Sequence, residues 1–251
     1  MRSGTLLIVF KFLISQTDGV IKMLNSIIKR SSRLSPMTET EIKVIKSAVK
    51  QFLQNGFSGT TIKMISDDTG IKPGNITYYY RTKEDMLLVL MQEIMDFHLD
   101  MIDEAQQKLD DPLVAYATEV TAQIALCETD AAAKDLYYSA YNHPKTFEHI
   151  KDWTAKKNFH LLGTLLPDLS EEDFRKLENV ACCIELSAFV TACDRYFTLE
   201  DKIRLILDSL LKLFDIKKEE RKRVVEEILK LDYIKLGKDM FEKFVSRLEK
   251  H

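Results

Sequence analysis

Residues 60–86, TTIKMISDDTGIKPGNITYYYRTKEDM, decide the fold of the N-terminal part of the chain. Thr60 and Thr61 can cap a helix, because a hydroxyl oxygen accepts a hydrogen bond from the free N–H groups of the first turn. Gly70 suits a sharp turn after that helix, since glycine adopts a positive φ without strain. Pro73 fits the first turn of a second helix, where its missing N–H has no cost. The spacing therefore predicts two short helices joined by a glycine turn.

A helix-turn-helix motif of this kind places its second helix in the DNA major groove. The inner face of that helix carries Ile76 and Tyr80, and its outer face carries Asn75, Thr77, Tyr78 and Tyr79. An ordinary helical hairpin with a solvated polar face is the alternative. Three consecutive tyrosines are unusual on such a face, because each has a large apolar ring. The pattern therefore favours DNA binding.

A longer helix precedes the motif. Its apolar residues keep helical spacing; they are Ile42, Ile45, Ala48, Val49 and Phe52. Asn55-Gly56 ends this helix as a C-terminal cap would. Three helices of this size share one small core.

Residues 40–90 resemble the DNA-binding domain of the TetR family of bacterial transcriptional regulators. The resemblance rests on the end of the first helix (52–57), the Thr-Thr-Ile opening of the second, Ile65, Gly70 and Ile71, the segment 74–80, and the segment 83–86. Three positions differ from the usual family pattern: Ser66 replaces alanine, Thr77 replaces tyrosine and Tyr80 replaces phenylalanine. The tyrosine that Thr77 replaces usually contacts the DNA backbone, and a threonine hydroxyl is also able to bond a phosphate.

The resemblance implies an all-α protein, with an N-terminal three-helix helix-turn-helix DNA-binding domain followed by a larger helical ligand-binding and dimerisation domain. It implies a cytoplasmic homodimer that represses transcription at a palindromic double-stranded operator and is released by an effector. Lys83 would bind phosphate from the first turn of its helix, whereas Lys72, Asn75 and Tyr78 would lie nearest the base edges. The full expected DNA-binding set is Thr60, Thr61, Lys72, Gly74, Asn75, Thr77, Tyr78, Tyr79 and Lys83.

Composition and charge agree with a helical DNA-binding protein. The chain is 45% hydrophobic with only eight glycines and five prolines, which favours an all-helical fold with a sizeable core. Its formal charge of −3 is unevenly distributed: residues 1–36 carry net +5, residues 37–90 net +1 and residues 91–251 net −9. The acidity therefore lies away from the expected DNA end.

Three segments are expected: an N-terminal extension (1–36), the DNA-binding domain (37–84) and the effector-binding and dimerisation domain (85–251). The apolar run at residues 6–14 is interrupted by Lys11, lacks a cleavage site and is too short to cross a membrane. The extension is either a basic arm that touches DNA or an untranslated or disordered segment before a start at Met37. We favour the second interpretation, since Met-Thr-Glu-Thr-Glu is a natural start for the domain.

Helical patterns follow over residues 83–109, 113–127, 130–141, 146–166, 170–192, 198–214, 217–231 and 233–248. The helices at 170–192 and 198–214 are apolar on more than one face, so they are either central core helices or contact a partner subunit. In the family the corresponding helices form a two-fold dimer interface, and we favour that interpretation. The expected interface residues are Val180, Ile184, Ala188, Ala192, Ile203, Leu207 and Leu210. The last two helices extend beyond the usual family end, and the sequence leaves their role open.

Aromatic residues are concentrated in the middle helices, where they either line an apolar pocket or fill the core. The candidate pocket residues, for a small hydrophobic effector, are His98, Tyr116, Tyr137, Tyr141, Trp153 and Phe159. The four cysteines have no CxxC spacing, so neither a zinc site nor a disulfide framework is expected. No Gly-rich phosphate loop, nucleophile elbow or metal-binding His motif occurs, so no catalytic residue, metal or cofactor is expected. The alternative function is a helical-bundle interaction protein, or an enzyme, without a DNA-binding role.

Overall fold

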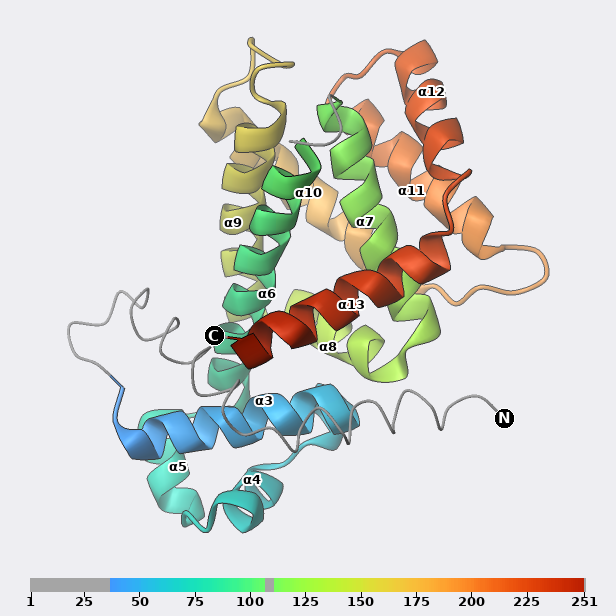
Figure 1. Cartoon of the computed structure of the whole chain (residues 1–251). Helices are drawn as coiled ribbons and strands as arrows, with labels where there is room; N and C mark the ends of the chain where they lie inside the picture. The colour runs from blue at the N-terminus through green and yellow to red at the C-terminus, as the bar shows by residue number, and fades with distance from the viewer. Residues whose placement is uncertain (1–36, 107–110, 251) are drawn as a thin grey trace. The chain divides into compact units, whose positions relative to one another are not determined.

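The computed structural model describes residues 37–106 and 111–250, and the expectations for residues 1–36 lie outside these ranges. All regular structure in the described ranges is α-helical, which confirms the expected fold class (Figure 1). The chain divides into two compact units. Unit 1 contains the described residues up to Glu93 and those from Glu242 onward, and unit 2 is Ile94–Phe241. The two points of division, Glu93/Ile94 and Phe241/Glu242, each fall inside a helix, so both units share two helices.

Unit 1 contains three complete helices and parts of two others: α3 (Glu39–Gly59), α4 (Ile62–Thr69), α5 (Pro73–Tyr79), the first part of α6 (Lys83–Gln106) and the end of α13 (Tyr233–Lys250). The helical geometry of α3 breaks at Gly56, whose φ of 75° and ψ of 165° suit glycine. Gly70 follows α4 with a φ of 72° and so forms the turn of the motif. Both bends lie at the glycines that the sequence indicated.

The helices of unit 1 share one core. Ile45 and Phe52 of α3, Ile65 of α4 and Ile76 of α5 are each fully buried. These residues stabilise the packing of the short helices, because burying a large apolar side chain contributes about 1.5–3 kcal/mol.

Unit 2 is a bundle arranged around one central helix, α7 (Figure 1). Nearly every residue of α7 between 113 and 127 is buried, because α7 contacts α8, α9, α10, α11 and α12. The helices of the unit are the rest of α6, then α7 (Pro112–Thr129), α8 (Ala131–Asn142), α9 (Pro144–Leu162), α10 (Glu171–Val190), α11 (Leu199–Leu213), α12 (Lys218–Ile228) and the first half of α13. Within the described residues, no helix has both the length and the apolar character needed to cross a membrane.

Two helix starts in unit 2 carry reciprocal caps. Ser170 accepts from the N–H of Asp173, whose carboxylate accepts from Ser170 in return, and Thr198 and Asp201 repeat this arrangement at α11. These capping boxes satisfy N–H groups that the helix itself leaves free, so they fix where α10 and α11 begin. Both starts agree with the sequence expectation.

α12 and the first half of α13 belong to the structure of unit 2. In α12, Val224, Val225 and Ile228 are buried in its core. Gly237 of α13 lies so close to α7 that a Cβ atom there would be 2.8 Å from the carbonyl oxygen of Ala122 and 2.8 Å from the nitrogen of Leu126. Only a glycine permits this approach of two backbones.

Candidate functional site

The most exposed part of the helix-turn-helix is α5. Ile76 and Tyr80 hold it against the core with 0% and 1% of their surface exposed. Lys72, Asn75 and Tyr78 lie on its outer side, and Tyr78 is 82% exposed. An exposed tyrosine of this kind is unusual unless a partner covers it. The helix is therefore fixed by one face and free to contact a partner through the other.

The remaining α5 residues support this surface. The hydroxyl of Thr77 donates to the carbonyl oxygen of Gly74 at 3.1 Å, and both residues are exposed. The ring of Tyr79, which is half-buried, meets that of Tyr78 edge to face with a centroid distance of 5.3 Å. Tyr79 therefore supports the position of the more exposed Tyr78.

The two threonines before α4 have different positions. Thr61 is exposed and caps α4, since its hydroxyl accepts from the N–H of Met64 at 3.2 Å. Thr60 is only 1% exposed, and its hydroxyl donates to the carbonyl oxygen of Gly56 at 2.8 Å. The Thr60 side chain bonds a carbonyl group at the end of α3 and does not reach the surface. Thr60 is therefore not placed for the direct contact with DNA that we expected from the sequence.

Lys83 begins α6, as expected, but its ammonium group turns toward the α3–α4 corner. Its Nζ donates to the carbonyl oxygens of Phe57 at 2.7 Å and Thr60 at 3.0 Å, and it lies 4.1 Å from the centroid of the Phe57 ring. Carbonyl groups at the end of a helix attract a positive charge. Lys83 therefore ties the start of α6 to the base of the helix-turn-helix.

The segment from the turn to the start of α6 is positive although the chain is acidic. Residues 69–83 contain Lys72, Arg81 and Lys83 and no acidic residue. Lys63 in the first turn of α4 and Arg81 directly after α5 are exposed as well, and neither was in the expected set. Their signal in the sequence was a positive charge next to the recognition segment, which suits contact with phosphate.

The carboxylate of Asp68 in α4 bonds to α3. Lys50 lies 2.8 Å from it, and the Ser47 hydroxyl donates to it at 2.7 Å. Burial raises the pKa of Asp68, but the hydrogen bonds from Lys50 and Ser47 outweigh burial and lower that pKa below its usual value. The charge of Asp68 is therefore matched within the motif.

The candidate pocket residues of unit 2 separate into groups. His98, Tyr116, Tyr137 and Tyr141 are buried, Trp153 is half-buried and Phe159 is 37% exposed. The two candidate tyrosines of α8 pack against Phe189, with centroid distances of 5.4 Å for Tyr137 and 5.2 Å for Tyr141. Phe159 instead packs on Phe174, at 5.7 Å. The structure thus brings Tyr137 and Tyr141 together and leaves Phe159 at the surface.

A buried ion pair lies beside these tyrosines. Both carboxylate oxygens of Glu119 in α7 accept from Nζ of Lys157 in α9, at 2.7 and 2.6 Å, and Nδ1 of His98 lies 3.2 Å from the same carboxylate. Burial raises the pKa of Glu119, but the charge of Lys157 and the hydrogen bond with His98 hold that pKa at about 2. Nε2 of His98 also lies 3.4 Å from the Tyr137 hydroxyl.

Two further carboxyl groups, Glu178 and Glu185, are buried on α10, and we call them the α10 carboxyls. Glu178 accepts from Nδ2 of Asn158 at 2.7 Å, and Glu185 accepts from the Tyr141 hydroxyl at 2.7 Å. Burial raises the pKa of both groups, and the charge of Glu178 adds to the effect on Glu185, whose pKa is about 7. Neither glutamate was expected from the sequence, although a seven-residue spacing puts them on one helix face.

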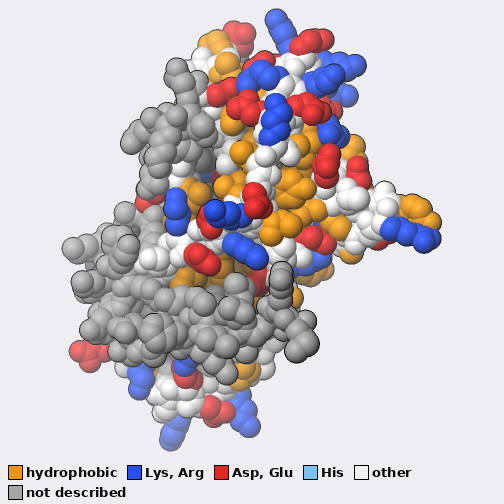
Figure 2. All heavy atoms as spheres, turned by 45° about the vertical axis from the view of Figure 1, so that its right-hand side comes forward, with side chains coloured by type: hydrophobic (Ala, Val, Ile, Leu, Met, Phe, Trp, Pro, Cys, Tyr) orange, Lys and Arg blue, Asp and Glu red, His pale blue; other side chains and the backbone are white. Residues whose placement is uncertain are grey.

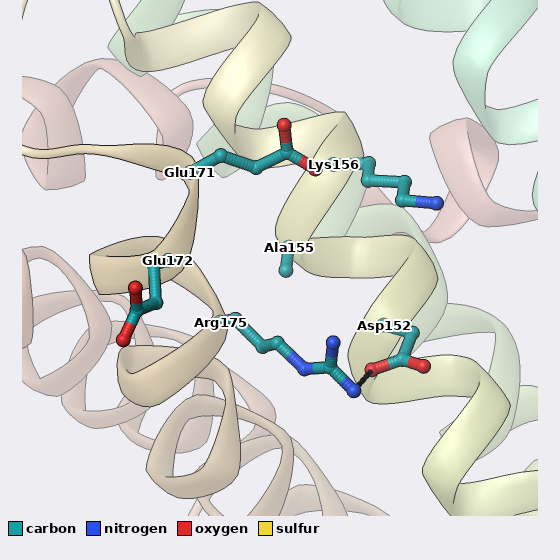
Figure 3. A pocket seen from close by; sticks show the side chains of 6 residues that line it. All are labelled: Asp152, Ala155, Lys156, Glu171, Glu172 and Arg175. Carbon is teal, nitrogen blue, oxygen red and sulfur yellow. Dashed lines mark ion pairs between the residues drawn. The ribbon is translucent and has the colours of Figure 1, made fainter.

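A hollow of about 280 Å³ opens elsewhere on the surface of unit 2 (Figure 3). The lining comes from α9 and the start of α10, and Arg175 of α10 pairs with Asp152 of α9 at 2.7 Å across it. None of the six candidate pocket residues borders it, since it is lined by Asp152, Ala155, Lys156, Glu171, Glu172 and Arg175. Such a charged lining does not suit an apolar ligand. Among the described residues, no group of three or more His, Cys, Asp or Glu side chains could hold a metal ion.

The expected interface residues are only partly exposed. Ile203, Leu207 and Leu210 of α11 are 0% exposed and Ala188 of α10 is 4% exposed. These four pack in the core of their own unit, so their assignment to a subunit interface is corrected. Val180 is 50% exposed, Ala192 is exposed and Ile184 is half-buried.

Other apolar residues face outward on these two helices. Val190 of α10 and Leu205 of α11 are more than half exposed, at 52% and 57%. On the side where α11 and α12 lie in Figure 1, hydrophobic side chains gather in a patch that charged side chains border (Figure 2). A patch with a charged border is typical of a surface that another molecule covers.

Comparison with known proteins places the motif in a family. Residues 44–90 match the family model described as bacterial regulatory proteins, tetR family. The uncharacterized HTH-type transcriptional regulator YuxN of Bacillus subtilis (strain 168) is 31% identical over 85 residues, which are 34% of this chain and 29% of that protein. The HTH-type transcriptional regulator RutR of Escherichia coli (strain K12) is 29% identical over 83 residues, 33% of this chain and 36% of that protein. The chain thus spans about a third of the length of these relatives.

Two other similarities extend further along the chain. The HTH-type transcriptional regulator HbdR of Aromatoleum sp. (strain CIB) is 26% identical over 159 residues, 61% of this chain and 68% of that protein. The crystal structure of RolR without ligand superposes with a TM-score of 0.54 and 15% identity, covering 73% of this chain and 95% of that one. At this identity the superposition shows a shared fold. In its family match at residues 44–90, its helix-turn-helix and its all-α fold, this chain is similar to the bacterial transcriptional regulators of the tetR family.

Proposed function

We propose that this protein is a cytoplasmic, ligand-responsive repressor that binds a palindromic DNA operator as a homodimer. The observation that carries this proposal is the position of α5, which is anchored by Ile76 and Tyr80 and exposes Lys72, Asn75 and Tyr78. An amide side chain can bond both N6 and N7 of an adenine, and a lysine can bond the acceptors of a guanine. Asn75 and Lys72 therefore have the chemistry to specify bases from the major groove.

The residues around α5 have the chemistry for backbone contact. Thr61 and Thr77 expose hydroxyl groups, Tyr79 is half-buried beside Tyr78, and Lys63 and Arg81 expose positive charges. Phosphate contacts fix the register of the protein on the duplex and carry no sequence information. In this proposal Thr61, Lys63 and Arg81 position the protein, and Lys83 joins them through a phosphate beside the α3–α4 corner.

We propose further that the homodimer forms through the outer faces of α10 and α11. Support comes from the exposed apolar side chains of Val180, Val190 and Leu205, which are available for contact with a partner subunit. Two recognition helices then meet successive half-sites of the operator, about 34–36 Å apart.

The effector would act through α6. Lys83, at one end of this helix, bonds the α3–α4 corner of unit 1, and His98, further along, contacts Glu119 and Tyr137 in unit 2. A ligand that rearranges the surroundings of His98 displaces α6 and, with it, the reading heads. Since both heads must fit successive half-sites together, a shift of a few ångströms releases the operator.

The test begins with selection of binding sequences from a random duplex library by the full chain. Asn75→Ala is expected to weaken binding to the selected duplex by about 1–3 kcal/mol and to change binding to unrelated DNA little, since it removes a base contact. The matched control is Asn142→Ala, an exposed asparagine at the end of α8 in unit 2. Fluorescence anisotropy at fixed salt measures both affinities. If no sequence is enriched, or if Asn75→Ala binds the selected duplex as the wild type does, the proposed function is wrong.

A further inference from the structure

The buried charges of unit 2 are unevenly matched. Glu119 is neutralised by Lys157, whose Nζ bonds both of its carboxylate oxygens. The α10 carboxyls have no such partner: among the described residues, no lysine, arginine or histidine lies within ion-pair distance of Glu178 or Glu185. Glu178 is 0% exposed and Glu185 is 9% exposed, so water does not readily supply the missing compensation. A buried carboxylate without a cation is strongly unfavourable.

The same place has more hydrogen-bond acceptors than donors. Asn158 is 1% exposed and donates its amide nitrogen to Glu178, which turns this side chain toward the α10 carboxyls. Its Oδ1 atom is buried and has no partner, and neither has the hydroxyl of Tyr116, which is also 1% exposed. Burial and then the charges of Glu185 and Glu178 raise the pKa of Tyr116, so this hydroxyl lies in their field. The charge of Lys157 reaches both α10 carboxyls and opposes the rise in their pKa, but its ammonium group is bonded to Glu119. What the site lacks is a positively charged group that donates N–H bonds to Glu178 and Glu185 themselves.

Aromatic rings stand beside these groups. The ring of Tyr141, whose hydroxyl bonds Glu185, meets Phe189 edge to face at 5.2 Å, and the ring of Tyr116 meets Phe214 in the same way at 5.8 Å. Ring faces attract ammonium groups and also pack against an apolar body. The surroundings therefore fit a ligand that combines a cationic head with an aromatic or aliphatic part.

We propose that the effector is a small organic amine whose ammonium group binds between Glu178 and Glu185 and donates to Oδ1 of Asn158. This inference deepens the proposed function, and rests on it only where it gives the site a regulatory role. It replaces the hydrophobic effector that the sequence suggested with a cationic one. A neutral or anionic ligand of the same shape leaves both carboxyls without a partner, so the site discriminates against it.

The first experiment uses the wild-type full chain and ligands of matched shape. Benzylamine, phenethylamine and tryptamine are compared with the alcohol and the carboxylate of the same skeletons, by thermal unfolding and by titration calorimetry. We expect at least one amine to raise the unfolding temperature, and its neutral and anionic counterparts not to do so. Benzyltrimethylammonium, which has the charge and no N–H donor, should bind at least tenfold more weakly than benzylamine if both bind. The inference is overturned if no amine protects, or if an alcohol or carboxylate protects as well as its amine.

The second experiment uses variants that keep the shape of the side chain. Glu178→Gln and Glu185→Gln are each expected to weaken amine binding at least tenfold, since each removes a charge that faces the ammonium group. Glu172→Gln, an exposed glutamate in the first turn of the same helix, should bind the amine as the wild type does. Unchanged affinity in both buried variants contradicts the inference, and the ligand series on the wild type decides the question if either variant fails to fold.

A third measurement separates this inference from the proposed function. The amine that protects best is added to the protein bound to its selected duplex, and release is followed by anisotropy. Release supports the regulatory role, whereas tight amine binding that leaves the DNA complex intact overturns that role. If the protein binds the amine but selects no DNA sequence, the proposed function is contradicted and the inference of an amine site between the α10 carboxyls is still supported.

Discussion

Replacing Glu185 by glutamine changes one charge in the core of unit 2 and little else. The amide oxygen of glutamine can still accept from the Tyr141 hydroxyl, which lies 2.7 Å from the carboxylate of Glu185. Burial, followed by the charge of Glu178, raises the pKa of Glu185 from 4.5 to about 7, against the opposing charge of Lys157 and the hydrogen bond from Tyr141. The variant removes this titration and keeps the volume of the side chain.

The sign of the effect follows from proton binding. A carboxyl group whose pKa is higher in the folded protein binds its proton more tightly there, so it stabilises the fold below pH 4.5 and loses that contribution as pH rises to about 7. The gap between 4.5 and about 7, at about 1.36 kcal/mol per pH unit, corresponds to about 3 kcal/mol. Between pH 5 and pH 8 the change is about 2.5 kcal/mol.

The assay is urea unfolding of the wild type and of Glu185→Gln at several pH values from 5 to 8. The variant should gain about 2.5 kcal/mol on the wild type across this range, because it has no buried carboxyl group to ionise there. Glu119 does not confuse the comparison: its pKa is lowered to about 2, so its stabilisation is fully present above pH 4.5 and is lost only at lower pH. Glu172→Gln serves as the control, since its glutamate is exposed on the same helix.

A constant difference between wild type and variant over the whole range would refute this reasoning. It would mean that Glu185 titrates near its ordinary value and is not buried with its charge unmatched. A gain of the same size in Glu172→Gln would also refute it, because the effect would then come from the net charge of the chain.

Two further pairs of substitutions test the packing of unit 2 and its outer surface. Gly237→Ala should destabilise the protein by about 1–3 kcal/mol in urea unfolding, because the new Cβ meets backbone atoms of α7 at 2.8 Å. Gly59→Ala is the control and should change stability little, because its new Cβ would meet only the Cβ of Asn55, at 3.6 Å. Val180→Glu should shift the protein toward monomer in sedimentation experiments and keep its helicity, since Val180 is 50% exposed, whereas Ala188→Glu should unfold it because Ala188 is 4% exposed. A Val180→Glu protein that stays dimeric would move the interface away from this face.

The helix-turn-helix was predictable because its signals are local. Thr61 caps α4, Gly70 has the positive φ of the turn, and Ile76 and Tyr80 are buried in α5 as their spacing indicated. Thr60 was misplaced because either of two adjacent hydroxyls could cap α4. The Thr60 hydroxyl donates to the carbonyl oxygen of Gly56, and this hydrogen bond depends on the bend at the end of α3. The sequence does not indicate that the bend brings this carbonyl group close to Thr60.

The buried face of α10 could not be read from its apolar residues. Apolar spacing selected Val180 and Ile184 for a contact with a partner subunit, whereas the positions buried within the unit include Glu178, Cys182 and Glu185. A glutamate enters a core only where distant side chains bond it, here Asn158 of α9 and Tyr141 of α8. Those partners come from other helices, so a pattern within one helix could not identify them.

The outcome for α11 has a different cause. Ile203, Leu207 and Leu210 form a strong apolar stripe, which indicates burial but does not distinguish the core of a unit from a subunit interface. The stripe packs in the core of unit 2, and Leu205 on the other side of α11 is exposed. An outward-facing leucine in a mostly polar stretch is the weaker signal in the sequence, yet it marks the surface that is open to a partner.

The small size of α5 affects how tightly this protein can hold DNA. A helix of seven residues is well below the length that persists alone in water, so its order depends on the burial of Ile76 and Tyr80. Its backbone amides are therefore expected to open and exchange with solvent far more often than those of α3. DNA binds only the ordered form of α5, so the free energy needed to order this helix reduces the net free energy of DNA binding. Substitutions at Ile76 or Tyr80 can thus weaken operator binding at every sequence alike, with all contacts to the bases unchanged.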